Sequence, residues 1–304
     1  MDDKLIIGKK NAFLYINGRG PDNTGANNQY SEATFITATV GCENQRSLVL
    51  IPDGLMFQSD KGIWLLGRDL STTYIGAPVE DFVLGANVVS AATIPETNQV
   101  RFIMDSGITL VYDYFYAQWS IFTGVPGVSS CIFEDMHTFI NDEGEVYQES
   151  AGTYLDGSRP VLMSFKTGPL RLGTLQGYQR AYFLYLLGTY YSPHKLVVNL
   201  FYDYEPSASQ SIIISPVNYS TPFGSGASQS PFGQQDPFGG PSNLEDWQVY
   251  FERQRCMAFA VQVQEIFDTN FPTSTNKGLD LSGIQVVMGM KKGYRPQANV
   301  ISAG

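Results

Sequence analysis

Histidine, cysteine and carboxylate side chains are the residues of this sequence that could perform catalysis or bind a metal, and few of them fall into a recognisable pattern. The two histidines, His137 and His194, lie far apart, and His194 is predicted to end a turn before a strand. No Cys/His spacing typical of a metal site occurs. The sequence also lacks the Gly-x-Ser-x-Gly nucleophile elbow and the phosphate loop Gly-x-x-x-x-Gly-Lys-[Ser/Thr]. We therefore expect no cofactor and no metal.

Three aspartates recur in equivalent positions, each two residues before a glycine. The pairs are Asp60 and Gly62, Asp105 and Gly107, and Asp142 and Gly144. A glycosidase needs only two carboxylates, so catalysis has to be considered for these residues. An aspartate followed by a glycine also supplies the backbone angles of a tight hairpin turn. We interpret all six as structural residues of blade turns, not as a catalytic or metal site.

The elements around these turns predict a β-propeller. The turns recur at roughly 40–50 residues, and a repeat of that length with four short strands indicates one propeller blade per repeat. The first strand-like runs are predicted at Lys4–Lys9, Ala12–Asn17, Ser47–Ile51, Leu55–Gln58 and Ile63–Leu66. The clearest repeat follows and reads as four strands: VVSAATI, QVRFIM, GITLVYDY and QWSIFTG. The earlier hairpin, GLMFQ and GIWLL around Asp60, is apolar on both faces, as expected of a blade that packs between two others.

The predicted fold class is all-β, with partial propeller blades followed by a β-sandwich-like domain. Residues 1–160 supply about three to four blades, fewer than many closed propellers contain. An unclosed ring would leave strand edges open to aggregation. We expect the chain to be the C-terminal part of a longer protein, or to complete its ring with another chain. Residues 161–304 contain about seven strand-like runs without the Asp-x-Gly repeat, which favours a two-sheet sandwich. These runs are Leu170–Leu175, Arg180–Thr189, Lys195–Tyr204, Ser211–Ser215, Trp247–Arg253, Met257–Phe267 and Leu279–Met290.

A polar insert interrupts the second domain at residues 206–243. It contains Pro-Phe-Gly three times and is rich in Gly, Ser and Gln. One interpretation is a flexible loop. The alternative is a docking arm in which Phe223, Phe232 and Phe238 anchor in pockets of a neighbouring subunit.

Composition narrows the function classes. Charged residues make up 16% of the 304 residues and aromatic residues 13%, which favours a surface that partners bury. The net charge of −10 argues against tight binding of nucleic acid. The sequence contains no run of 18 apolar residues, so we expect no membrane-spanning helix. The N-terminal stretch MDDKLIIGKKN is not expected to be a signal peptide. The three cysteines Cys42, Cys131 and Cys256 are widely spaced, which fits a reducing cytosol.

Three long segments and one short one resemble, in their order along the chain, the tail nozzle or hub proteins of short-tailed bacteriophages, also described as packaged-DNA stabilisation proteins. They are DGLMFQSDKGIWLLGRDLSTTYIGAPVEDF, TNQVRFIMDSGITLVYDYFYAQWS, LQGYQRAYFLYLLGTYYSPHKLVVNLFYDYEPS and VVMGMKKGYRP. The resemblance runs from about Lys4 to Pro296. Members of that family are usually longer, with an extra N-terminal half, so this chain resembles their C-terminal half.

The resemblance implies a structural protein of the virion tail, made in the bacterial cytoplasm. It implies a homo-oligomeric ring, expected to be hexameric, that contacts tail adaptor and fibre or spike proteins. Viral DNA would pass through its lumen without sequence-specific binding, and no small-molecule substrate is expected. The protein is then not an enzyme. A glycan- or receptor-binding β-propeller module is the alternative, and a glycoside hydrolase on a propeller is a third interpretation.

Overall fold

A computed structural model describes residues 1–124, 127–150, 155–157, 159–171, 178–190, 195–214, 244–266 and 279–290. The fold is all-β, as the sequence predicted, and the sheets of the described residues are antiparallel. The chain divides into two compact units, Met1–Ala151 and Gly152–Gly304. The boundary predicted after residue 160 therefore lies inside the second unit. None of the helices among the described residues is long and apolar enough to cross a membrane.

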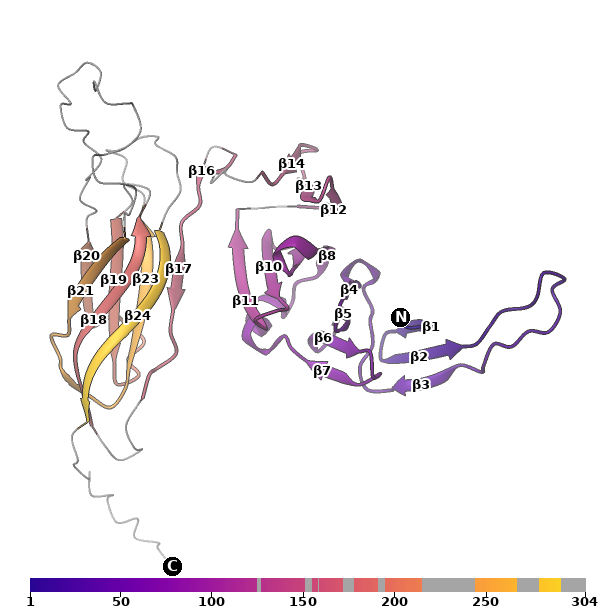
Figure 1. Cartoon of the computed structure of the whole chain (residues 1–304), viewed down its shortest axis with the longest axis horizontal. Helices are drawn as coiled ribbons and strands as arrows, with labels where there is room; N and C mark the ends of the chain where they lie inside the picture. The colour runs from indigo at the N-terminus through magenta and orange to yellow at the C-terminus, as the bar shows by residue number, and fades with distance from the viewer. Residues whose placement is uncertain are drawn as a thin grey trace, which may run out of the picture. The chain divides into compact units, whose positions relative to one another are not determined.

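The first unit contains four sheets in chain order, each made of strands that follow one another in the sequence (Figure 1). The first sheet holds β1 (Lys4–Lys9), β2 (Ala12–Asn17) and β3 (Thr34–Thr37). The second sheet holds β4 (Val49–Ile51), β5 (Gly54–Ser59), β6 (Gly62–Gly67) and β7 (Thr72–Tyr74). The third sheet holds β8 (Val88–Ile94), β9 (Gln99–Met104), β10 (Ile108–Asp113) and β11 (Gln118–Thr123). The fourth sheet holds β12 (Ser129–Phe133), β13 (Met136–Ile140) and β14 (Val146–Gln148).

Short helical turns join these sheets. They are the 3-10 helices at Gln45–Ser47, Ala77–Val79 and Pro95–Thr97 and the α-helix α1 (Glu80–Val83). The sequence predicted a strand over Ser47–Ile51, but a 3-10 helix includes Ser47 and the strand begins at Val49. The side chain of Asn44 accepts a hydrogen bond from the backbone N–H of Arg46 and so caps this helix. Strands β3 and β7 were not predicted, because each has only three or four residues and forms the edge of its sheet.

The second sheet lies between the first and the third and buries both of its faces. Met56 and Ile63 face the third sheet, where they join a core with Phe102 and Leu110. The next residues along the same strands face the other way, and Phe57 packs in a core with Phe13 of the first sheet. Because successive strand residues point to opposite faces, the continuous apolar runs of β5 and β6 serve two cores at once.

The fourth sheet packs on the remaining face of the third. The hydroxyl groups of Ser90 on β8 and Ser130 on β12 lie 2.9 Å apart, and Ser90 Oγ also accepts from the backbone N–H of Ser130. A Cβ placed on Gly127 would approach Ile103 of β9 to 2.8 Å, so the chain enters the fourth sheet with little space to spare. The four sheets of the first unit thus form one stack, with each sheet packed on the next.

The described residues of the second unit form a sandwich of two four-stranded sheets. One sheet has the order β17 (Ser164–Lys166), β23 (Phe259–Ile266), β19 (Lys195–Tyr202) and β20 (Gln210–Ile214). In the other, β18 (Gln179–Tyr190) pairs with β21 (Leu244–Tyr250), β22 (Arg255–Cys256) and β24 (Leu279–Met290). A two-stranded hairpin, β15 (Leu155–Asp156) and β16 (Arg159–Pro160), precedes them.

One core joins the two sheets of the sandwich. Leu184 and Leu186 of β18 pack in it with Leu200 of β19 and Val261 of β23. Six of the seven strand-like runs predicted for this domain overlap strands of the structure. The run predicted at Leu170–Leu175 is wrong in its described part, because Leu170 makes only a single bridge, to Phe259.

Candidate functional site

The Asp-x-Gly pairs of the first unit lie in hairpin turns of three successive sheets. Ser59 and Gly62 form the last pair of β5 and β6, so Asp60 and Lys61 make the loop between them. Gly62 has a φ of +99°, and a Cβ there would lie 2.8 Å from the ring of Tyr74. Only glycine combines that backbone angle with the close approach of the ring. Ser59 Oγ donates a 2.8 Å hydrogen bond to the Asp60 carboxylate, which fixes the turn locally.

Asp105 and Asp142 occupy similar turns but differ in what they bind. The Asp105 carboxylate accepts from the backbone N–H of Asn87 at 3.0 Å and from its side-chain amide at 3.2 Å. It therefore ties the β9–β10 turn to the chain entering β8. Asp142 is exposed, and in its turn the side-chain oxygen of Asn141 accepts from the backbone N–H of Glu145 at 2.8 Å. Gly107 and Gly144 have φ of +80° and +85°.

We expect Asp105→Ala to lower the free energy of unfolding by about 1 kcal/mol, because it removes two hydrogen bonds to Asn87 at an exposed site. Asp142→Ala is the matched control and should stay within about 0.5 kcal/mol of the parent protein. Urea unfolding of the three proteins measures both values. Equal losses in the two variants would contradict the structural role given to Asp105.

Three predicted residues cannot be placed by this structure. Phe223, Phe232 and Phe238, proposed as anchors for a neighbouring subunit, lie outside the described residues. His194 lies outside them too. Among the residues that are described, no group of three or more His, Cys, Asp or Glu side chains could hold a metal ion.

A charged cluster that the sequence did not predict lies between the third and fourth sheets. Arg101 on β9 contacts the carboxylate of Glu149, which follows β14, through Nη1. The same Nη1 lies 3.4 Å from His137 Nδ1, and His137 Nδ1 lies 3.7 Å from Glu149 Oε1. Arg101 and His137 are buried, whereas Glu149 is 43% exposed. The cluster therefore links the two sheets and opens to solvent only at Glu149.

Burial sets the protonation states of this cluster. It lowers the pKa of His137 to about 4, and the positive charge of Arg101 adds to that effect. His137 is therefore neutral at pH 7, and a neutral imidazole can accept from Arg101 at Nδ1. Its Nε2 is buried and has no hydrogen-bond partner in the described part of the chain. Burial also lowers the pKa of Arg101 to about 10, so its guanidinium stays charged at pH 7.

The sequence held one signal of this cluster. Arg101 interrupts the apolar run QVRFIM, and a charge inside a buried strand needs a partner. The partner was not predictable, because His137 and Glu149 belong to the next sheet and reach Arg101 only when the sheets stack. The arrangement joins a cation, an anion and a neutral imidazole in one closed contact, and it can hold the two sheets together.

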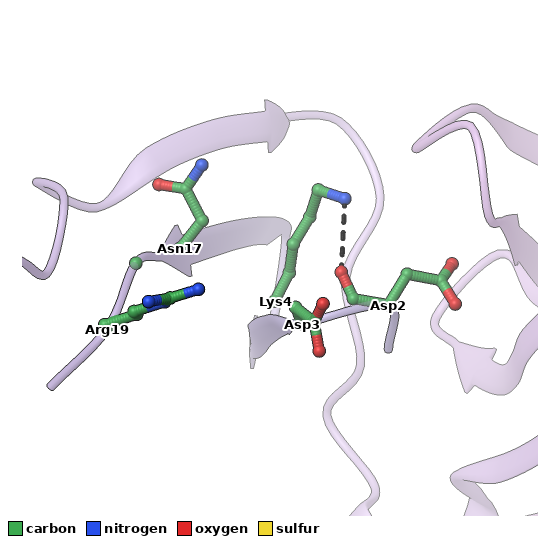
Figure 2. A pocket seen from close by; sticks show the side chains of 6 residues that line it. Asp2, Asp3, Lys4, Asn17 and Arg19 are labelled. Carbon is green, nitrogen blue, oxygen red and sulfur yellow. Dashed lines mark hydrogen bonds between the residues drawn. The ribbon is translucent and has the colours of Figure 1, made fainter.

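A hollow of about 600 Å³ lies beside the first sheet (Figure 2). It is lined by Asp2, Asp3, Lys4, Asn17, Gly18 and Arg19. Lys4 Nζ donates to the backbone oxygen of Asp2 at 3.5 Å, while the Asp2 carboxylate binds Arg68. The lining is mostly exposed and carries both signs of charge. Nothing in this geometry selects one ligand charge, and we assign no ligand to it.

The sandwich carries aromatic side chains on the outer face of its β18 sheet. Phe183 and Tyr185 alternate with the core residues of β18 and so point outward. Their rings lie 5.5 Å apart, and Phe183 lies 6.0 Å from Tyr250 on β21. A hollow of about 400 Å³ adjoins them, with Tyr185, Leu187, Asp246, Gly283, Ile284 and Gln285 around it. This face could stack a flat or ring-shaped ligand.

Comparisons with known proteins give little guidance. No family model and no curated protein matches the chain. Among solved structures, the exo-β-1,3-galactanase of Phanerochaete chrysosporium with galactose is similar at 9% identity and a TM-score of 0.19. A variant of that enzyme with β-1,3-galactotriose gives 9% identity and a TM-score of 0.18. Both matches cover 94% of this chain and 68% of the other. TM-scores this low support no conclusion about fold or activity.

Proposed function

We propose that this chain is a structural protein of a short-tailed bacteriophage, part of a ring-shaped tail nozzle through which genomic DNA is retained and then ejected. The observation that carries the proposal is the resemblance of the four segments in their order along the chain. These segments supply strands of both units. DGLMFQ and the residues after it form β5 to β7, TNQVRF begins β9 to β11, and LQGYQR leads into β18 and β19.

The architecture is compatible with an assembly role. The first unit presents a stack of small sheets, and the second presents a sandwich with an aromatic outer face. Such surfaces fit a subunit that is buried on several sides by copies of itself and by adaptor or fibre proteins. A homo-oligomeric ring, hexameric by the resemblance, is the assembly we propose.

The charge balance fits a DNA conduit. With 29 acidic and 19 basic residues, the chain can line a channel that does not hold phosphate groups. Each phosphate neutralised by Lys or Arg would add a salt-dependent affinity that slows passage. The proposal therefore predicts a lumen with a neutral or negative wall and no sequence-specific contact with DNA.

Electron microscopy of the parent phage particle tests this function. We expect density for this chain as a ring on the tail axis, and particles made without the chain should lose packaged DNA. A particle that lacks the chain, or that holds it away from the axis, would refute the nozzle. A ring whose lumen is lined with Lys and Arg would refute the conduit model.

A receptor- or glycan-binding module is the second candidate, and the aromatic outer face of the β18 sheet favours it. Aromatic rings exposed on a sheet can stack on sugars or on a protein receptor. A glycan array separates the candidates, with Tyr185→Ala as the test variant and the exposed Tyr116→Ala in the first unit as its matched control. Specific hits that only Tyr185→Ala abolishes would support this second function.

A further inference from the structure

The stack of four sheets has two end faces that no other sheet of the first unit covers. Internal faces are buried on their central strands: Phe57 and Met56 on the second sheet and Ile103 and Val111 on the third are almost fully inaccessible. The side chains on the outer faces of the first and fourth sheets are far more exposed, yet many of them are apolar. A sheet face that is apolar and uncovered indicates a partner.

Strand alternation identifies the residues on the outer face of the first sheet, called here the leading face. Ile6 and Phe13 point into the core shared with the second sheet, so their sequence neighbours point outward. Pairing across the strands then places Leu5, Ile7, Ile16 and Phe35 on the leading face, around Leu14, which is itself buried. Leu5 is 62% exposed and Phe35 is 63% exposed.

Strand alternation also identifies the residues on the outer face of the fourth sheet, called here the trailing face. Ser130, His137 and Phe139 point toward the third sheet. The residues between them form the trailing face, with the apolar side chains Cys131, Phe133, Met136, Ile140 and Val146 around the polar residues Ser129, Thr138 and Gln148. Phe133 is 58% exposed and Val146 is 69% exposed.

The two outer faces differ in charge. In the hairpin of β1 and β2, Lys10 is paired with Glu43 and Lys4 lies on the opposite face, so the leading face carries the unpaired lysine Lys9 and no acidic strand residue. Residues 129–149 contain no lysine or arginine and six acidic residues: Glu134, Asp135, Asp142, Glu143, Glu145 and Glu149. Glu149 is paired with Arg101 inside the stack, which leaves five acids around the trailing face. Lys9 pairs with Ala12 on the leading face itself.

We propose that the leading face of one copy of this chain binds the trailing face of a second copy. Both faces carry exposed apolar side chains, and the acids around the trailing face complement Lys9 on the leading face, whereas two trailing faces would bring acid to acid. The contact continues the rule by which each sheet of the stack covers the next. Two copies joined in this way supply eight sheets, within the range of closed propellers.

Such a contact is heterologous, because it joins different surfaces of the two copies. It closes into a ring when the rotation between copies allows and extends into a filament when it does not. The inference goes beyond the nozzle proposal and does not depend on it. An assembly formed by purified protein would support the contact even if the chain were absent from a phage tail.

Light scattering coupled to size-exclusion chromatography tests the proposal with the whole chain. We expect the parent protein to show at least twice the 33.6 kDa of one chain. Phe35→Glu on the leading face and Val146→Lys on the trailing face should each reduce the mass to that of one chain. Each places a buried charge opposite like charges of the partner face. Ile213→Glu, on an equally exposed strand residue of the second unit, is the control and should leave the mass unchanged.

Mixing the two variants gives the decisive result. The intact trailing face of Phe35→Glu can bind the intact leading face of Val146→Lys, so an equimolar mixture should recover at least a pair. A parent protein that stays monomeric would overturn the proposal. A loss of assembly in only one variant would overturn it too, since a contact between like faces needs only one of them.

Circular dichroism checks that the variants are folded. Far-ultraviolet circular dichroism must show the parent strand signal, and Leu5→Glu replaces Phe35→Glu if that variant unfolds.

Cys131 lies on the trailing face and is exposed, while Cys42 and Cys256 are buried. Maleimide should therefore label Cys131 slowly in the parent assembly and rapidly in Phe35→Glu. Equal labelling of the two folded proteins would contradict the contact.

Discussion

Phe102→Ala is expected to lower the free energy of unfolding of the first unit by about 3–5 kcal/mol. Phe102 lies on β9, is fully buried, and packs in the core that joins the second and third sheets. Removing its ring loses the transfer free energy of the buried atoms and leaves a cavity between two sheets that both contribute to it. That loss is a large share of the total stability of a typical domain.

Fluorescence-detected urea unfolding measures this effect. The chain has three tryptophans, and a Trp247→Phe background leaves only Trp64 and Trp119, both in the first unit. Phe115→Ala is the matched control, because Phe115 is 71% exposed and its loss should change stability by less than about 0.5 kcal/mol. If the two alanine variants were equally stable, the face-to-face packing of the second and third sheets would be wrong.

The stability of the first unit is expected to fall by about 3 kcal/mol as the pH drops from 6.5 to about 4, because of His137. Burial and Arg101 lower the pKa of His137 from 6.5 to about 4 in the folded protein. Between these values the unfolded chain binds a proton that the folded chain does not. The free energy of unfolding therefore rises with pH across this window, and the stabilisation is lost as acid protonates the unfolded chain.

Urea unfolding between pH 4 and pH 7 tests the effect, with His137→Gln as the comparison. Glutamine does not titrate, so the variant should lack this part of the pH dependence, even if its stability at pH 7 is lower. Glu149 faces His137 and is present in both proteins, so the difference in slope is assigned to His137. Asp22, whose pKa is lowered to about 2 by hydrogen bonds from Thr24, Asn27 and Ala26, titrates below this window. Identical slopes would contradict a buried, neutral His137.

Local sequence features predicted much of the strand framework. The runs at Lys4–Lys9, Ala12–Asn17 and Gln99–Met104 match β1, β2 and β9 to the residue. In these strands apolar and polar residues alternate, or the strand ends at a turn that contains Gly, Asn or Asp. Both signals depend only on residues close together in the sequence. The burial of β5 and β6 on both faces could also be predicted, because a continuous apolar run offers no polar face to solvent.

The short edge strands and the contacts between residues far apart in the chain could not be predicted from the sequence. Strands β3 and β7 are held by pairing with β2 and β6, and their own residues carry little pattern. Asp105 was predicted as a turn residue, but its two hydrogen bonds to Asn87 depend on how the third sheet folds. The proposed anchors Phe223, Phe232 and Phe238 stay predictions, as do the ring, its partners and its place in a virion.

The sequence by itself determined an all-β chain, a first region of repeated small sheets and a second region of different pattern, because alternation and turn chemistry are local properties. The tertiary structure decided which residues meet. It brought Arg101, His137 and Glu149 together between two sheets, and it left Leu5, Phe35, Phe133 and Val146 exposed at the ends of a stack. Both outcomes depend on which face of a sheet is covered, and that is set by packing between segments far apart in the chain.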